Sequence, residues 1–151
     1  MNRELVKDLF LSLLIVLSQL LIFNHINLFG TVSTFIYVSL FILYKTTYDK
    51  TYLILFGFIV GLIIDLSLQT YGAHTLASIT VCYLKERIEK YSFGVNSTLP
   101  LAMIRGTQQT NRVTYFFLII FLHSLIYFSL IFFKFEFALT IFLFTLINSI
   151  I

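Results

Sequence analysis

The side chains that could do chemistry in this chain are few and lie far apart in the sequence. The histidines are His25, His74 and His123, and the one cysteine is Cys82. No His-Glu-x-x-His motif or Cys/His cluster occurs, so the spacing predicts no metal site. No serine lies in a Gly-x-Ser-x-Gly turn, and no acid–base pair is visible. We therefore expect no catalytic residue, no metal ion and no cofactor.

Asp65 is the one acidic residue inside an apolar run, close to the end of that run. Gly57 and Gly61 precede it at steps of four, and such steps drift only about 40° around an α-helix. The three residues therefore share a face, and the Gly-x-x-x-Gly spacing lets another helix approach closely. The carboxylate could be satisfied inside the protein, or this face could contact another membrane protein. A proton or ion relay is less favoured, because no second buried acid or base accompanies Asp65.

Two histidines extend this set of candidate residues. His74 follows a tight turn that contains Gly72, and His123 lies in the middle of an apolar run. A histidine inside a helix bundle usually hydrogen-bonds another helix, and we expect this of both. Tyr37, by contrast, is expected to be an interfacial anchor. The candidate face for helix packing or partner binding thus comprises Gly57, Gly61, Asp65, Gly72, His74 and His123.

The composition sets the environment in which these residues work. Hydrophobic residues make up 59% of the 151 residues, charged residues make up 11%, and the mean hydropathy is +0.96. A soluble domain of this length could not bury so much apolar surface, whereas a lipid bilayer can accept it. The net charge of +3 is dispersed along the chain and does not indicate nucleic-acid binding.

Six apolar stretches predict six transmembrane helices in a single domain. They cover approximately residues 9–23, 28–44, 52–68, 73–88, 113–133 and 137–151. The fourth and sixth are short for a span of about 20 residues. The fourth can continue as a helix to Lys90, because Lys85 with Glu89 and Glu86 with Lys90 are opposite charges four apart. The sixth reaches the last residue, so it either ends at the interface or has been cut short.

The basic residues predict the orientation of these helices. Alternate connecting segments, including a loop over residues 91–112, hold nine of the ten Lys and Arg residues, and the other segments hold only Lys134. The positive-inside rule then places both termini in the cytoplasm. The expected fold is an all-α integral membrane protein, built as a compact bundle of six transmembrane helices.

Two neighbouring motifs resemble a known family. The run Gly57-Phe58-Ile59-Val60-Gly61-Leu62-Ile63-Ile64-Asp65-Leu66, followed by Tyr71-Gly72-Ala73-His74-Thr75-Leu76-Ala77, is similar to the bacterial rod shape-determining protein family MreD. Members of that family show a glycine-rich third helix with an Asp near its outer end. A Gly-apolar-His turn then leads into a helix of small residues. His123 and the step Phe135-Glu136-Phe137 also look like family features.

This resemblance implies a non-catalytic subunit of the cell-elongation complex in the bacterial inner membrane. Its expected partner is an MreC-like single-span protein, and the complex would connect MreB-like filaments to a RodA-type peptidoglycan polymerase. The alternative is a substrate-capture subunit of a vitamin transporter, which also has six helices. That function needs an outward cavity with several convergent polar groups, and the sequence offers few candidates. They are Asn24, His25, Asn27, Asp65, Gln69 and His74.

Overall fold

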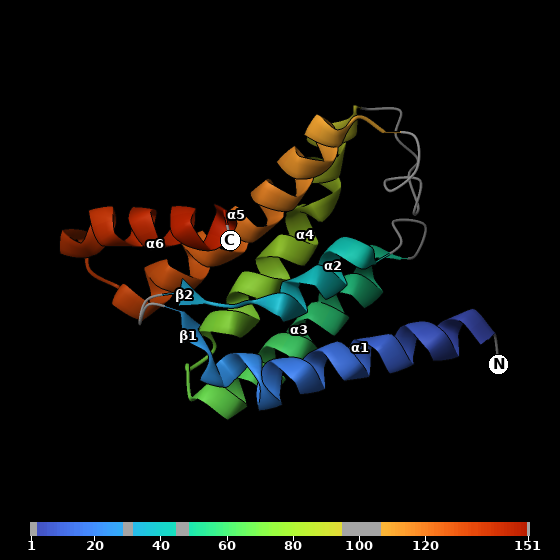
Figure 1. The fold of residues 1–151 in the computed structure, drawn as a ribbon, viewed down its shortest axis with the longest axis horizontal. Helices are drawn as coiled ribbons and strands as arrows, with labels where there is room; N and C mark the ends of the chain where they lie inside the picture. Colours follow the sequence, from blue (N-terminus) through green and yellow to red (C-terminus); the bar gives the residue numbers. More distant parts are fainter. Residues whose placement is uncertain (1–2, 29–31, 45–48, 95–106, 151) are drawn as a thin grey trace.

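The computed structural model describes residues 3–28, 32–44, 49–94 and 107–150, which form a mainly helical protein (Figure 1). Its elements in chain order are α1 (Arg3–Leu21), η1 (Phe23–His25), β1 (Asn27–Leu28), β2 (Val32–Ser33), η2 (Ile36–Val38), α2 (Ser39–Leu43), α3 (Lys50–Leu68), α4 (Ala73–Phe93), α5 (Gln109–Phe132), η4 (Phe135–Phe137) and α6 (Ala138–Ile150). The expectation of an all-α fold is confirmed, apart from the two-residue strands β1 and β2.

Helix α4 is the centre of the arrangement. It packs against α3 on one side and α5 on the other, and α5 in turn packs against α6. In Figure 1, α1 (blue) and α6 (red) lie on opposite sides of these three helices. The short segment η2–α2 contacts α1, α4 and α5. Its Tyr37 and Phe41 are fully buried, together with Ile64, Val81 and Ile119 from the three central helices.

Three helical segments in the described part of the chain are long and apolar enough to cross a membrane. They are Lys7–His25, Lys50–Leu68 and Gln109–Phe132, and the shorter apolar segment Phe135–Ile150 follows them. Large apolar side chains on these helices are exposed, among them Phe10, Leu66 and Leu139. Lipid is the environment that makes such a surface stable, so the chain is a helical membrane protein.

The structure corrects the expectation of one continuous helix over residues 28–44. Here β1 pairs antiparallel with β2, in the register Asn27 with Ser33 and Leu28 with Val32. Among the described residues of this stretch, only Ile36–Leu43 is helical, as η2 followed by α2. The β-branched residues Val32 and Thr34 lower the helix propensity at the start of this stretch. The apolar composition of residues 28–44 predicted that this segment lies in the membrane, but it did not predict the conformation of its backbone.

The other predicted helices are present, with shifted ends. Helix α4 continues to Phe93, well past the apolar run, as the charge pattern predicts. Both predicted pairs form, with Lys90 Nζ 2.6 Å from Glu86 Oε1 and Lys85 Nζ 3.9 Å from Glu89 Oε1. The expected loop over residues 91–112 is shorter than predicted, because α5 already begins at Gln109; residues 95–106 lie outside the described part.

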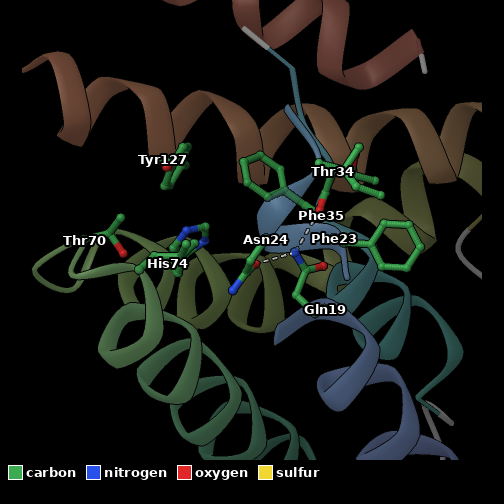
Figure 2. Close-up of a pocket in the computed structure, with 10 residues that line it drawn as sticks. Gln19, Phe23, Asn24, Thr34, Phe35, Thr70, His74 and Tyr127 are labelled. Carbon is green, nitrogen blue, oxygen red and sulfur yellow. Dashed lines mark hydrogen bonds between the residues drawn. The ribbon is translucent and has the colours of Figure 1, made fainter. Parts of the chain in front are cut away.

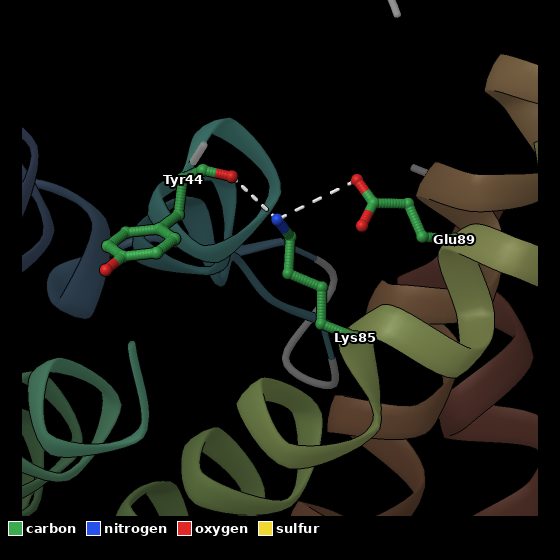
Figure 3. Close-up of polar contacts among 3 residues, drawn as sticks. All are labelled: Tyr44, Lys85 and Glu89. Atoms are coloured by element: carbon green, nitrogen blue, oxygen red, sulfur yellow. Dashed lines mark hydrogen bonds and ion pairs between the residues drawn. The ribbon is translucent and has the colours of Figure 1, made fainter. Parts of the chain in front are cut away.

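Lys85 connects α4 to the end of α2 (Figure 3). Its Nζ donates to the carbonyl oxygen of Tyr44 at 2.6 Å, and Tyr44 is the C-cap residue of α2. Carbonyls at a helix C-terminus carry partial negative charge, so a cation is stabilised there. The side chains of Lys85 and Glu89 are only 3% and 4% exposed. This pair therefore helps to pack the helices, whereas Glu86 and Lys90 form an exposed pair.

The start of α3 is fixed by a side-chain cap. Asp49 is the N-cap residue, and its Oδ1 accepts a hydrogen bond from the backbone N–H of Thr51 at 2.8 Å. This bond satisfies one of the free N–H groups of the first turn. It also holds the pKa of the Asp49 carboxyl below its usual range, because it stabilises the ionised form.

The two glycines of α3 allow close contact with α4. A Cβ added to Gly57 would lie 2.6 Å from the Sγ of Cys82, and one added to Gly61 would lie 2.5 Å from the Cα of Thr75. The first obstacle is a side chain, whereas the second is backbone. The glycine face therefore packs inside the chain, and Gly61 is the less replaceable of the two.

We predict that Gly61→Ala destabilises the protein by roughly 1 to 3 kcal/mol, as overpacking does elsewhere. Gly57→Ala should also destabilise it, but Gly57→Ala combined with Cys82→Ala should recover most of the loss, because the added methyl fills the space of the sulfur. Cys82→Ala should not rescue Gly61→Ala. Thermal unfolding in detergent measures all four variants. Equal rescue of both glycine variants would contradict this packing.

Candidate functional site

The carboxylate of Asp65 caps the N-terminus of α4. The N-cap residue of α4 is Gly72, which has no side chain and adopts a left-handed φ of +93°. The side chain of Asp65, which lies in α3, provides the cap that Gly72 cannot provide. Its Oδ1 accepts from the backbone N–H of His74 at 3.0 Å, and its Oδ2 accepts from the N–H of Thr75 at 2.7 Å. The hydroxyls of Thr75 and Thr70 also donate to this carboxylate.

These four donors explain how an acidic side chain can be buried here. Asp65 is only 5% exposed, and an ionised carboxylate without partners would be very unfavourable at such a position. The free N–H groups at a helix N-terminus supply both hydrogen bonds and partial positive charge. Of the roles considered for Asp65, the structure shows the one in which hydrogen bonds inside the protein satisfy the carboxylate.

We predict that Asp65→Leu destabilises the protein by about 2 kcal/mol or more, because it leaves the first turn of α4 without a cap. Asp65→Asn should have a milder effect, since its amide oxygen can still accept one N–H bond. Thermal unfolding of the purified protein gives the order, with Glu136→Gln, at an exposed site away from this turn, as the matched charge control. If Asp65→Asn and Asp65→Leu are equally damaging, the capping role is not the main one.

A second buried polar group joins three elements through one hydroxyl. The Oη of Tyr37 lies 2.9 Å from Nδ1 of His74 and 2.6 Å from Nε2 of His123. All three side chains are at most 1% exposed. Helices α4 and α5 are thereby connected through η2. The expectation that both histidines bond another element is confirmed, whereas the expectation of an interfacial Tyr37 is wrong.

Neutral histidines can make these contacts in two ways. The hydroxyl has one proton, so it donates to one ring nitrogen and accepts from the N–H of the other ring. If it donates to His74, then His74 carries its own proton on Nε2; if it donates to His123, then His74 donates through Nδ1 and its Nε2 is an acceptor. His74 Nε2 and His123 Nδ1 have no hydrogen-bond partner among the described residues.

We predict that Tyr37→Phe lowers stability by roughly 1 to 3 kcal/mol, because two buried histidine nitrogens lose their shared partner. The control is Tyr71→Phe, since the side chain of Tyr71 is fully exposed. Unfolding temperatures of the two variants measure the difference. An equal, small effect of both changes would show that the buried hydroxyl contributes nothing.

Gln19 of α1 satisfies the backbone of the irregular segment that leads to Tyr37. Its Nε2 donates to the carbonyl oxygen of Thr34 at 2.9 Å and to Oδ1 of Asn24 at 2.8 Å (Figure 2). Its Oε1 accepts from the backbone N–H of Tyr37 at 3.3 Å. Backbone groups that are not in a regular helix need such partners at membrane depth. Nothing in the local sequence identified Gln19, because its role depends on a segment 15 residues away.

A cavity of about 200 Å³ lies next to these residues, at the end of the bundle where α3 turns into α4. Its polar wall includes Gln19, Asn24, Thr70 and His74 (Figure 2). Its aromatic wall is formed by Phe23, Phe35 and Tyr127. The ring of Tyr127 lies 4.4 Å from that of His74, measured between centroids. The cavity thus combines aromatic surface with uncharged hydrogen-bonding groups.

The predicted site residues divide into three groups in the structure. Gly57, Gly61 and Asp65 lie in the α3–α4 contact, and His74 and His123 meet at Tyr37. Gly72 is the left-handed turn residue, with open space around its Cα. In the described ranges, no three His, Cys, Asp or Glu side chains lie close enough to hold a metal ion.

Comparisons with protein-family models, with curated proteins and with solved structures gave no significant match to this chain. The resemblance to MreD proteins therefore depends on the residues of the chain itself.

Proposed function

We propose that this chain is a non-catalytic membrane subunit of the bacterial cell-elongation complex, similar to MreD. In that role it binds an MreC-like single-span protein in the inner membrane and helps to connect MreB-like filaments to a RodA-type peptidoglycan polymerase. The observation that best supports this proposal is that residues of the MreD-like motifs act together in the structure. Gly61, Asp65 and His74 together fix how α3 turns into α4.

The proposed topology is six membrane crossings with both termini in the cytoplasm. The irregular second segment can make a crossing, since residues 32–35, if extended, add about 13 Å and residues 36–43, as helix, add about 12 Å. Together they approach the roughly 30 Å of a bilayer core. Non-helical backbone is tolerated at that depth when its polar groups find partners inside the protein, and the carbonyl oxygen of Thr34 accepts a hydrogen bond from Gln19 Nε2 at 2.9 Å.

The partner would bind a face other than the glycine face, because α4 already covers Gly57 and Gly61. Exposed apolar side chains remain on α1, including Phe10, Leu14 and Leu21, and on α6, including Leu139 and Leu143. A single-span protein inside the membrane can reach either helix. We propose that one of these two helices carries the contact.

The vitamin-capture alternative has weaker support. It needs a cavity large enough for a vitamin, and ligand pockets for molecules of that class usually measure about 300 to 1,000 Å³. The cavity found here measures about 200 Å³. Of the polar candidates whose side chains the structure describes, Asn24 and His74 line it, whereas His25, Asp65 and Gln69 do not.

Site-specific photo-crosslinking in native membranes tests the proposal. Crosslinkers at Leu14 and Leu143 report on the exposed faces of α1 and α6, and a crosslinker at the buried Val60 is the control. We expect one exposed position to capture a single-span protein with an MreC-like external domain, and we expect Val60 to capture none. Absence of any such adduct from both faces would contradict the proposed partner.

Reporter fusions test the orientation in the same cells. Fusions at Asn27, Thr70 and Lys134 should report the outside, whereas fusions at Lys50 and Gln108 should report the cytoplasm. The nine-to-one division of Lys and Arg between the two sides is the physical reason. An external signal at Gln108 would overturn the topology without affecting the crosslinking result.

A further inference from the structure

We propose that Lys50, Tyr83 and Arg87 together bind the phosphate group of an anionic phospholipid at the membrane surface. We call these three residues the Tyr83 cluster. The lipid site goes beyond the scaffold role, and only its assignment to the cytoplasmic leaflet rests on the proposed topology. It follows from the charges of the cluster, its position along α3 and the apolar surface beside it.

Two cations from different helices meet at one aromatic ring. The Nζ of Lys50, the first residue of α3, lies 4.4 Å from the centroid of the Tyr83 ring, and the Cζ of Arg87 lies 6.0 Å from the same centroid. The electron-rich face of an aromatic ring attracts cations at such distances. Tyr83 is 50% exposed and Arg87 is also exposed, so a molecule outside the protein can reach both.

The neighbouring carboxylates have other partners. Among the described residues, neither Lys50 nor Arg87 forms an ion pair. Glu86 is near enough to feel both positive charges, but its Oε1 lies 2.6 Å from Nζ of Lys90. Asp49 accepts the hydrogen bond that caps α3. Two like charges held at one ring repel each other, so a bound anion would lower the electrostatic free energy of the cluster.

The Tyr83 cluster lies at the edge of the bilayer. Helix α3 is long and apolar enough to cross a membrane and begins at Lys50, so this residue marks where the span meets the headgroups. Basic side chains at this depth attract anionic lipids. In the proposed topology this edge is the cytoplasmic one, and the cytoplasmic leaflet has a negative surface potential.

Apolar surface next to the cluster favours a lipid over free phosphate. Leu76, Tyr83 and Arg87 follow one another on α4 at steps of seven and four residues, so they share one face of the helix. Leu76 is 48% exposed. Thr80 lies between them on this face, and its hydroxyl donates to the carbonyl oxygen of Leu76 at 2.8 Å. From Arg87 inward, the face thus presents a cation, an aromatic ring and an aliphatic side chain, which matches the order of phosphate and acyl chain in a phospholipid.

Native mass spectrometry of the full chain in detergent measures the affinity for single phospholipids. Phosphatidylglycerol is the probe, and phosphatidylcholine with the same acyl chains is its zwitterionic control. We expect phosphatidylglycerol to bind more tightly by roughly tenfold or more. Lys50→Gln and Arg87→Gln should each weaken its binding about fivefold, the factor that about 1 kcal/mol per basic residue gives. Lys134→Gln is the matched control, because it makes the same charge change at an exposed lysine outside the cluster.

Two variants of Tyr83 test the role of its ring. Tyr83→Phe keeps the aromatic face and should bind phosphatidylglycerol as the unmodified chain does. Tyr83→Leu removes that face and should weaken binding roughly two- to fivefold, as the loss of an exposed cation–π contact predicts. Unfolding temperatures check that every variant is folded, and if one Gln variant is not, the other decides.

Free phosphate is the competing ligand, and inorganic phosphate is tested against sodium chloride at the same ionic strength. We expect both salts to reduce phosphatidylglycerol binding equally. The lipid site is overturned if inorganic phosphate displaces the lipid where sodium chloride does not, or if phosphatidylcholine binds as tightly as phosphatidylglycerol. It is also overturned if folded Gln variants of the cluster behave like Lys134→Gln. The crosslinking result is independent of these outcomes, and an inverted orientation would move the site to the other leaflet without removing it.

Discussion

The carboxylate of Asp65 is the interaction on which the rest of the structure depends. Helix α4 begins at a glycine that cannot cap it, and the side chain that does so comes from the preceding helix. Asp65 thus holds the end of α3 to the first turn of α4, while Gly61 allows the two backbones to approach closely. Since α4 is the helix against which α3 and α5 pack, the position of its first turn also sets where His74 meets Tyr37.

The segment before α2 shows how an irregular backbone can lie inside a membrane protein. Residues 32–35 lack helical hydrogen bonds, so their polar groups need other partners. Gln19 serves the carbonyl of Thr34 and the N–H of Tyr37, and Tyr37 is thereby held where its hydroxyl reaches both histidines. Hydrogen bonds of Gln19 and Tyr37 thus connect α1 to η2, and η2 to α4 and α5.

The proposed subunit role requires exposed surface that a partner in the membrane can reach. The buried side chains of Gln19, Asp65 and Lys85 bond backbone groups of neighbouring elements, and apolar side chains on α1 and α6 are exposed.

The sequence by itself determined the membrane environment, the helical fold, the end of α3 at Leu68 and the start of α4 at Ala73, because these follow from apolar composition, charge spacing and turn residues that act locally. It also singled out Asp65, His74 and His123, since polar residues in apolar runs must find partners. Only the tertiary structure decided what those partners are. Gln19 escaped notice and Tyr37 was wrongly expected at the interface, because their bonds to Thr34, His74 and His123 join residues 15 to 86 positions apart, and no local pattern records such distances. The glycine face likewise could have met a partner or α4, and only the packing of the chain on itself decided between them.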